Sequence, residues 1–255
     1  MIHRLYAIVI LSHLLSGALQ AQGTRGFENG VKAQSTIEEI VRQPDLWMME
    51  VQFKQMRMVY VPVVDPQTGK ATEEHVWYLA YRFINRPVAS RPNEDSEPIN
   101  QLDPLPGPRM FQPKFTLITY DNPETEIPIE ILQDDQDDIV PDALPRIREI
   151  ERVAVENSVG LYRELPETVA EDAEEQPWVY GVATWRNVDP HTDFFKVIMT
   201  GFSNGYELRP GDDQATTWRR AIVQKFRRPG DEFDPNRKEF SFDGTASWIF
   251  VPDGK

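Results

Sequence analysis

The sequence predicts a mostly β protein built from antiparallel strands, as a sandwich or a barrel. Short runs rich in β-branched and aromatic residues recur along the chain, and clear turn signals separate them, which is typical of such folds. The densest series of runs spans residues 178–211. About 235 residues follow an N-terminal leader, which is enough for one large domain with a full hydrophobic core.

The leader, residues 1–21, has the pattern of a signal peptide. Arg4 gives a positive start, Leu5–Leu15 is an apolar run of suitable length, and small residues follow it. We expect cleavage after Ala18 or after Ala21. The apolar run is about half the ~20 residues that a membrane-spanning helix needs, so we expect no stable membrane anchor. The protein is therefore expected to be exported, as a periplasmic, secreted or cell-surface-associated protein.

The composition excludes several classes of function. The chain contains no cysteine, so it can form no disulfide, thiolate zinc site, covalent haem attachment or cysteine nucleophile. Its net charge of −14 opposes binding to nucleic acids and to anionic membrane surfaces. We interpret the acidity mainly as a means of keeping an exported protein soluble.

Residues 35–255 are expected to form a single domain, preceded by a flexible lead at residues 22–34. A short helix is predicted to open the domain, because Ser35 and Glu38 fit a capping box, which satisfies the first free N–H groups of a helix. Pro44 then ends the helical pattern.

A strand hairpin is predicted next. Apolar and polar residues alternate from Trp47 to Phe53, as in a half-buried strand, and the apolar phase then changes. One extra residue in a strand has this effect, so we expect a β-bulge near Gln55 or a strand shared by two sheets. A turn at residues 65–69 and a second strand at residues 75–85 complete the hairpin.

Two insertions are expected to extend the β scaffold. The first, at about 86–112, is rich in proline and suits neither a helix nor a strand ladder. The second, at about 133–176, is acidic and includes a stretch at 144–155 that fits either a helix or a strand. Between the two insertions, strands are expected at 115–120 and 127–132.

The aspartates at residues 134–138 form the sharpest charge run. They do not match an EF-hand calcium loop, because Ile139 and Pro145 stand where glycine and glutamate are needed. We interpret the run as a solvated acidic loop, with an incidental divalent-cation site as the alternative. We also hypothesise that the acidic stretch 121–142 faces a basic strand within the same molecule. That strand carries Arg219, Arg220, Lys225, Arg227 and Arg228.

From residue 178 onward the predicted strands follow one another closely, at 179–185, 195–202, 206–208, 217–227, 239–242 and 247–251. Asn204-Gly205 is the strongest hairpin signal among them, because both central residues of a type I′ turn need positive φ.

One combination of segments carries a resemblance: Leu46-Trp47, 76–82, 181–185 with 193–195, 201–206 and 228–233. It resembles a family of exported, functionally uncharacterised proteins of planctomycete-type bacteria, over most of the mature chain. The order of the strands is more loosely similar to that of immunoglobulin-like domains in exported bacterial proteins. The second likeness implies an immunoglobulin-like antiparallel β-sandwich. In this chain the sandwich is expected to carry the proline-rich and acidic loop insertions, which depart from a compact immunoglobulin-like module, and one or two short helices. Neither likeness implies an activity.

The best candidate site is the stretch from Asp189 to Asp193. Asp189, His191 and Asp193 place two carboxylates and an imidazole within five residues, a set that can supply ligands for a divalent metal or an acid and a base for hydrolysis. Asp189 followed by proline equally fits a capped turn, in which the carboxylate accepts free backbone N–H groups. We favour the cap, keep the metal site as the alternative, and assign no catalytic residue and no other cofactor.

Other motifs carry less weight. The letters of residues 201–205, Gly-Phe-Ser-Asn-Gly, match a hydrolase nucleophile elbow, but this motif lies between two predicted strands and not before a helix. Tryptophan and tyrosine residues could line a sugar-binding face, although aromatic residues in strands usually form the core. The many acidic residues do not identify a glycosidase carboxylate pair.

The sequence therefore favours an exported, non-enzymatic binding or structural module. The alternative is a secreted hydrolase or metal-dependent enzyme that uses Asp189, His191 and Asp193. A protein or glycan partner fits the first class and a nucleic acid does not. We expect a partner to dock on the proline-rich loop or along an exposed strand edge.

Overall fold

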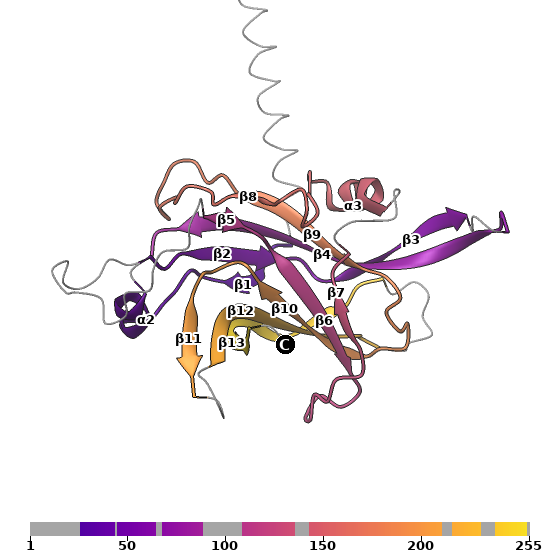
Figure 1. Ribbon diagram of the computed structural model, residues 1–255. Helices are drawn as coiled ribbons and strands as arrows, with labels where there is room; N and C mark the ends of the chain where they lie inside the picture. The colour runs from indigo at the N-terminus through magenta and orange to yellow at the C-terminus, as the bar shows by residue number, and fades with distance from the viewer. Residues whose placement is uncertain are drawn as a thin grey trace, which may run out of the picture.

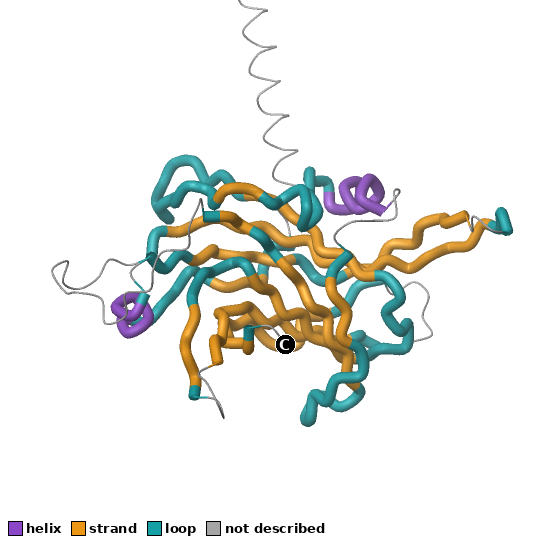
Figure 2. The backbone as a smooth tube through the Cα atoms, viewed as in Figure 1, coloured by secondary structure: helices purple, strands orange, loops and turns teal. Residues whose placement is uncertain are grey.

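The computed structural model describes residues 26–43, 45–64, 68–88, 109–135, 143–210, 216–230 and 238–253. They form two antiparallel sheets that pack face to face, with two short helices (Figures 1 and 2). The prediction of a mostly β sandwich is therefore confirmed. The predicted signal peptide at 1–21 and most of the proline-rich insertion, at 89–108, lie outside the described residues.

The first sheet is organised around one long strand, β4 (Ala71–Arg86). β2 (Met48–Phe53) and β3 (Arg57–Val64) pair with successive halves of β4 along one edge, and β9 (Val179–Trp185) pairs with the other edge. The predicted hairpin is thus confirmed, as β3 and β4. Its far end projects from the sandwich as a two-stranded arm (Figure 1).

A one-residue irregularity separates β2 from β3. Phe53 pairs with Tyr81 and Arg57 pairs with Tyr78, so four residue steps on one strand match three on the other. This extra residue is the bulge that the change of apolar phase predicted near Gln55. Before the bulge, alternate residues of β2 point into the core, as the alternation of the sequence predicted.

β1 (Asn29–Val31) pairs with β2 as the edge strand of the first sheet. The interpretation of residues 22–34 as a flexible lead is therefore wrong for this segment, which is too short to show an apolar period but buries Val31. The indole of Trp248, in the C-terminal strand, donates to the carbonyl of Lys32 at 2.9 Å. The first and last strands of the described chain are thus joined.

The second sheet has six strands. β7, β6, β10, β12 and β13 follow one another across it, and β11 pairs with β12 on the same edge as β10. Their bounds are β6 (Lys114–Tyr120), β7 (Ile131–Gln133), β10 (Phe194–Thr200), β11 (Tyr206–Arg209), β12 (Thr216–Arg227) and β13 (Ser241–Pro252). A separate two-stranded sheet pairs β5 (Met110–Phe111) with β8 (Arg163–Glu164).

β10 and β11 do not form the hairpin predicted at Asn204-Gly205. Both strands pair with β12, one after the other on one edge, because β13 occupies the other edge. Neither central residue has the positive φ of a type I′ turn, so that prediction is wrong. Seven residue steps from Met199 to Tyr206 match only three from Ile222 to Arg219. The chain therefore takes four more residue steps than β12 does, and it makes an excursion at residues 201–205 before it rejoins the same edge.

Aromatic side chains fill the space between the sheets. Trp77 of β4 meets Phe195 of β10 with ring centroids 5.2 Å apart, and Phe202 from the excursion contacts the rings of Tyr81 and Phe83. All five side chains are buried. The prediction that aromatic residues in strands form the core is confirmed at these positions.

The two helices begin and end as their sequences allow. α2 (Ile37–Arg42) has a capping box formed by Thr36 and Glu39, one residue later than predicted. α3 (Ala143–Glu151) shows that the ambiguous stretch of the acidic insertion is a helix. Pro145 is tolerated there, because N–H groups in the first turn have no partner within the helix.

α3 packs on the face of the first sheet that points away from the sandwich core, where Ile147 joins a second apolar cluster. Glu151, the last residue of the helix, is buried on this face. Its carboxylate accepts a hydrogen bond from the Tyr78 hydroxyl at 2.8 Å and pairs with Lys54 at 2.9 Å and Arg57 at 2.8 Å.

The charge of Glu151 is set by these neighbours. Burial alone would raise its pKa, but Lys54, Arg57 and the Tyr78 hydroxyl outweigh burial and keep the pKa below its ordinary value. Glu151 is therefore ionised in the folded protein. The buried Lys54 depends on it for compensation, and Arg57 shares it with Glu239. This carboxylate fastens the acidic insertion to the first sheet.

Replacing Glu151 by glutamine should destabilise the protein by about 3–5 kcal/mol, because it leaves the buried Lys54 without a compensating charge and Arg57 with Glu239 alone. Urea unfolding followed by circular dichroism measures the change. Glu149→Gln, on the exposed side of the same helix, is the matched control and should stay within about 0.5 kcal/mol of the wild type.

The difference between the wild type and E151Q should also depend on pH. Because the folded-state pKa of Glu151 is lowered, its stabilising effect is complete above the unfolded-state pKa of about 4.3 and is lost as the pH falls through the folded-state value. A difference in unfolding free energy that stayed constant from about pH 7 to about pH 3 would contradict this assignment.

Candidate functional site

The candidate site lies at the excursion, residues 201–205, where the chain leaves the second sheet and touches the first. The N–H of Met49 in β2 donates to the Phe202 carbonyl at 2.9 Å. The amide oxygen of Asn204 accepts the N–H of Trp47 at 2.8 Å, and its amide nitrogen donates to a neighbouring backbone carbonyl at 3.0 Å. The asparagine that suggested a hairpin turn thus ties the two sheets together.

Ser203 has a structural role in the excursion. Its hydroxyl donates to the Trp47 carbonyl at 3.0 Å and accepts the N–H of Gly205 at 2.9 Å, and the residue is buried. A nucleophilic serine at a strand-to-helix elbow must instead be exposed and lie beside a base. The match of residues 201–205 to the elbow letters therefore has no mechanistic meaning here.

Gly201 allows two chain segments to cross at close range. Its φ is +85°, and a Cβ at this position would overlap the carbonyl oxygen of Gln112. β6 begins beside this crossing, because its first residue, Lys114, pairs with Thr200 at the end of β10. β11 continues along the edge of β12 beyond the reach of β6, so no described strand lies on its other side.

A groove occupies this position, between α2 and β11. Its lining residues are Arg42, Gln43, Tyr206, Glu207 and Leu208. The Gly205 carbonyl accepts a hydrogen bond from the Arg220 N–H. In an antiparallel ladder the next residue points away from the partner strand, so the N–H and C=O groups of Tyr206 and Leu208 face the groove, not β12.

Four of the charged side chains around the groove form two ion pairs, whereas Arg42, which lines the groove, is exposed. Arg220 is buried and pairs with Glu39 of α2. Arg209 pairs with Glu207, and its guanidinium lies 3.9 Å from the ring centroid of Trp218. The groove therefore offers backbone polar groups, an exposed leucine side chain and the exposed cation of Arg42.

The site predicted from the sequence, at Asp189, His191 and Asp193, forms an exposed turn. Asp189 Oδ1 accepts the His191 N–H at 2.9 Å and lies 3.1 Å from the Nδ1 atom of that residue. Asp193 instead lies 3.9 Å from Arg228. The N–H and then the imidazole of His191 keep the pKa of Asp189 below its ordinary value. More than half of each of the three side chains is exposed.

This turn has the geometry of a cap. The structure brings Asp189 and His191 together, whereas the Asp193 carboxylate faces the guanidinium of Arg228. Within the described ranges, no three His, Cys, Asp or Glu side chains are placed to hold a metal ion. The metal site has no support from this geometry and stays a prediction.

The acidic run begins with a buried residue. Asp134 accepts the N–H of Phe115 at 3.1 Å and the hydroxyl of Ser158 at 2.5 Å. The interpretation of the run as a solvated loop is therefore wrong at Asp134, whose carboxylate satisfies backbone and hydroxyl donors. Asp137 and Asp138 lie outside the described residues.

The hypothesis that the basic strand faces the acidic stretch 121–142 is confirmed at Lys225, which pairs with Glu126, and is wrong for three of the arginines. They pair elsewhere: Arg219 with Asp253, Arg220 with Glu39 and Arg228 with Asp193. Strand alternation explains the different partner of Arg220, which lies on the opposite face of β12 from Lys225. Arg219 lies near the start of β12, far from Lys225 along the strand, and Arg228 follows the end of the strand.

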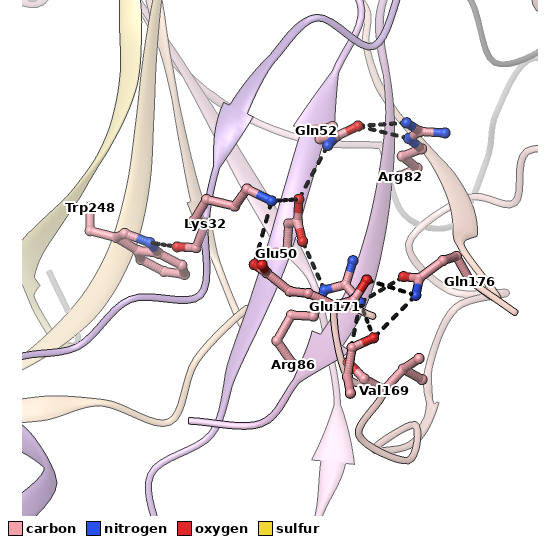
Figure 3. A network of polar contacts seen from close by, with 10 residues as sticks. Lys32, Glu50, Gln52, Arg82, Arg86, Val169, Glu171, Gln176 and Trp248 are labelled. Atoms are coloured by element: carbon pink, nitrogen blue, oxygen red, sulfur yellow. Dashed lines mark hydrogen bonds and ion pairs between the residues drawn. The ribbon is translucent and has the colours of Figure 1, made fainter. Parts of the chain in front are cut away.

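A second buried carboxylate lies on the outward face of the first sheet. Glu50 pairs with Arg86 at 2.8 Å and with Lys32 at 2.9 Å (Figure 3). Arg86 also donates to the carbonyls of Val169 and Ala170, at 3.2 Å each. Burial would raise the pKa of Glu50, but Lys32 and Arg86 outweigh burial and lower it. We interpret this network as structural, because its members satisfy one another.

Comparison with known proteins gives no match: no family model fits the chain, and no curated protein or solved structure is significantly similar to it. In the part of the chain that the structure describes, no helix is long and apolar enough to cross a membrane. The proposal below therefore rests on the sequence and on the geometry of this molecule.

Gly201→Ala should be strongly destabilising. The positive φ costs about 1–2 kcal/mol for a residue with a Cβ, and the overlap with the Gln112 carbonyl should add roughly 1–3 kcal/mol. Gly69→Ala is the matched control, because Gly69 also has positive φ but meets no atom that a Cβ would touch. Equal losses of unfolding free energy in the two variants would show that the crossing is not tight.

The capped turn predicts a stability that is insensitive to metal. Neither a chelator nor added calcium or zinc should shift the melting temperature of the mature protein, and His191→Ala should leave it unchanged. Asp189→Ala should lower the unfolding free energy by about 0.5–2 kcal/mol through loss of the cap. A bound ion whose removal lowers the melting temperature of the wild type, but not of the His191→Ala variant, would support the metal site instead.

Proposed function

We propose that this chain is an exported, non-enzymatic binding module, and that its ligand is an extended polypeptide segment that adds as a strand to β11. The predicted signal peptide supports export. The absence of cysteine removes one class of catalytic nucleophile, and the hydroxyl of Ser203 is committed to backbone groups.

One observation carries the proposal: the backbone of β11 is unsatisfied along the groove. The N–H and C=O groups of Tyr206 and Leu208 point into it, and no described backbone group reaches them. An extended peptide laid in this groove would continue the line of β6 and complete the ladder, and α2 would form its opposite wall. Strand addition of this kind takes affinity from main-chain hydrogen bonds and specificity from alternate side chains.

The alternative, a secreted hydrolase or metal-dependent enzyme that uses Asp189, His191 and Asp193, has weaker support. An enzyme needs its groups to converge in a sheltered site. These three side chains are exposed, and Asp193 is directed to Arg228 and not to the other two.

The proposal is tested by selecting peptides from a random ten-residue library displayed on phage, with the mature protein as bait. Fluorescence anisotropy then compares the affinity of each selected peptide for the wild type and for two variants at Leu208. Leu208→Pro removes the N–H that faces the groove, a change that an edge strand tolerates. Leu208→Thr keeps this N–H. We expect at least a tenfold loss of affinity, about 1.4 kcal/mol, in Leu208→Pro and a smaller loss in Leu208→Thr.

Two outcomes would count against strand addition at β11. Selection could yield no binding peptide, or the selected peptides could bind Leu208→Pro as tightly as they bind the wild type. Urea unfolding of both variants serves as the folding control.

A further inference from the structure

A row of exposed isoleucines lies before and within β7, the edge strand of the second sheet at the side of the molecule away from β11 (Figure 1). Ile127, Ile129 and Ile131 are 68%, 60% and 61% exposed. Burial of apolar side chains of this size stabilises a folded protein, so this row forgoes that stabilisation in the free protein. Single exposed apolar residues are common, but an alternating row on a strand edge is a feature that proteins usually avoid.

The backbone of β7 is also open on its outer side. The N–H of Asp134 donates to the Phe115 carbonyl, and the N–H of Thr119 donates to the Glu130 carbonyl. By antiparallel alternation the intervening Ile131 therefore points its N–H and C=O away from β6, as does Gln133. No backbone hydrogen bond from the described residues reaches these groups.

The segment that carries the row is anchored. Glu126, just before it, pairs with Lys196 and Lys225 on the outer face of the second sheet. Hydrogen bonds with Lys196 and then Lys225 lower the pKa of Glu126, which keeps the anchor charged. Asn122 closes the preceding turn by accepting the N–H of Glu124 at 2.8 Å. The isoleucines are thus presented to solvent from a braced turn.

The surroundings of the row are acidic. Residues 121–135 contain six acidic residues and no basic one. Of these, Asp121 and Glu124 are exposed, and Glu130 is half-buried and accepts the N–H of Asp189 at 3.3 Å. The exposed carboxylate of Asp189 therefore borders the same edge. Charge here favours a partner that brings cations.

We propose that the β7 edge is a second docking surface, which binds an extended segment of a partner protein with alternating apolar and basic residues. The apolar side chains of the segment would pack on Ile127, Ile129 and Ile131, and its main chain would pair with Ile131 and Gln133. Its lysine or arginine side chains would meet the acidic border. A second copy of this chain is the less suitable occupant, because pairing two β7 edges would bring two acidic borders together.

The test uses a fluorescent seven-residue peptide of alternating lysine and valine, with a glutamate and valine peptide as the charge-reversed control. Anisotropy should show binding of the lysine peptide to the mature wild type, weakening as salt is raised, and at least tenfold weaker binding of the control. Amide hydrogen exchange should show protection of Ile131 and Gln133 when the lysine peptide is bound.

Three variants separate the contributions. Replacing Ile127, Ile129 and Ile131 together by threonine keeps strand propensity and should weaken binding at least tenfold. Asp121→Asn with Glu124→Gln should reduce the salt dependence. Leu208→Pro, on the β11 edge, should leave binding of this peptide unchanged, so this proposal and the proposed function can fail independently. Thermal unfolding confirms that each variant is folded.

Several results would overturn the proposal: no binding of the lysine peptide, equal binding of the two peptides, or affinity that the threonine variant retains. Sedimentation that shows a dimer of the wild type, lost in the threonine variant, would assign the edge to a second copy of the chain instead.

Discussion

The crossing of chain segments at residues 201–205 is the constraint on which the rest of the molecule depends. Here the chain between β10 and β11 leaves the edge of β12. It places Phe202 in the shared core and Asn204 beside the start of β2. The crossing requires a residue without a Cβ at Gly201, because the chain before β6 passes directly against it. β11 follows this crossing and lies beyond the end of β6, which begins opposite Thr200, so the groove lies next to the contact that joins the sheets.

Two buried carboxylates also hold separate segments of the chain together, on the face of the first sheet that points away from the core. Glu151 fastens α3, and Glu50 with Arg86 fastens the end of the acidic insertion. Buried ion pairs contribute little net stability compared with apolar packing, but breaking one is costly. Here these ion pairs fix the position of a polar insertion on the sheet, because this sheet face has only a small apolar cluster of its own.

Alternation from Trp47 to Phe53 predicted which residues of β2 face the core, the change of apolar phase after it predicted the bulge, and the turn signal at 65–69 between two strand-like runs predicted the hairpin. These features depend on local sequence. The groove could not be predicted, because Asn204-Gly205 has the composition of a hairpin turn. The Asn204 side chain instead accepts a hydrogen bond from Trp47, which is distant in the sequence. The Asp189 turn was identified as a cap from its own residues. The partners of Arg219, Arg220 and Arg228 come from three separate segments, which no local pattern indicates.

The bond between Trp248 and Lys32 spans 216 positions of the chain. A contact of this sequence separation closes a very long loop, and its entropic cost has to be met before the contact can stabilise anything. Topologies dominated by such contacts fold on the scale of milliseconds to seconds, not microseconds. Until β13 has paired with β12, the second sheet lacks one of its six strands and β1 lacks its contact with β13. The complete sandwich therefore depends on pairing between segments that are far apart in the sequence.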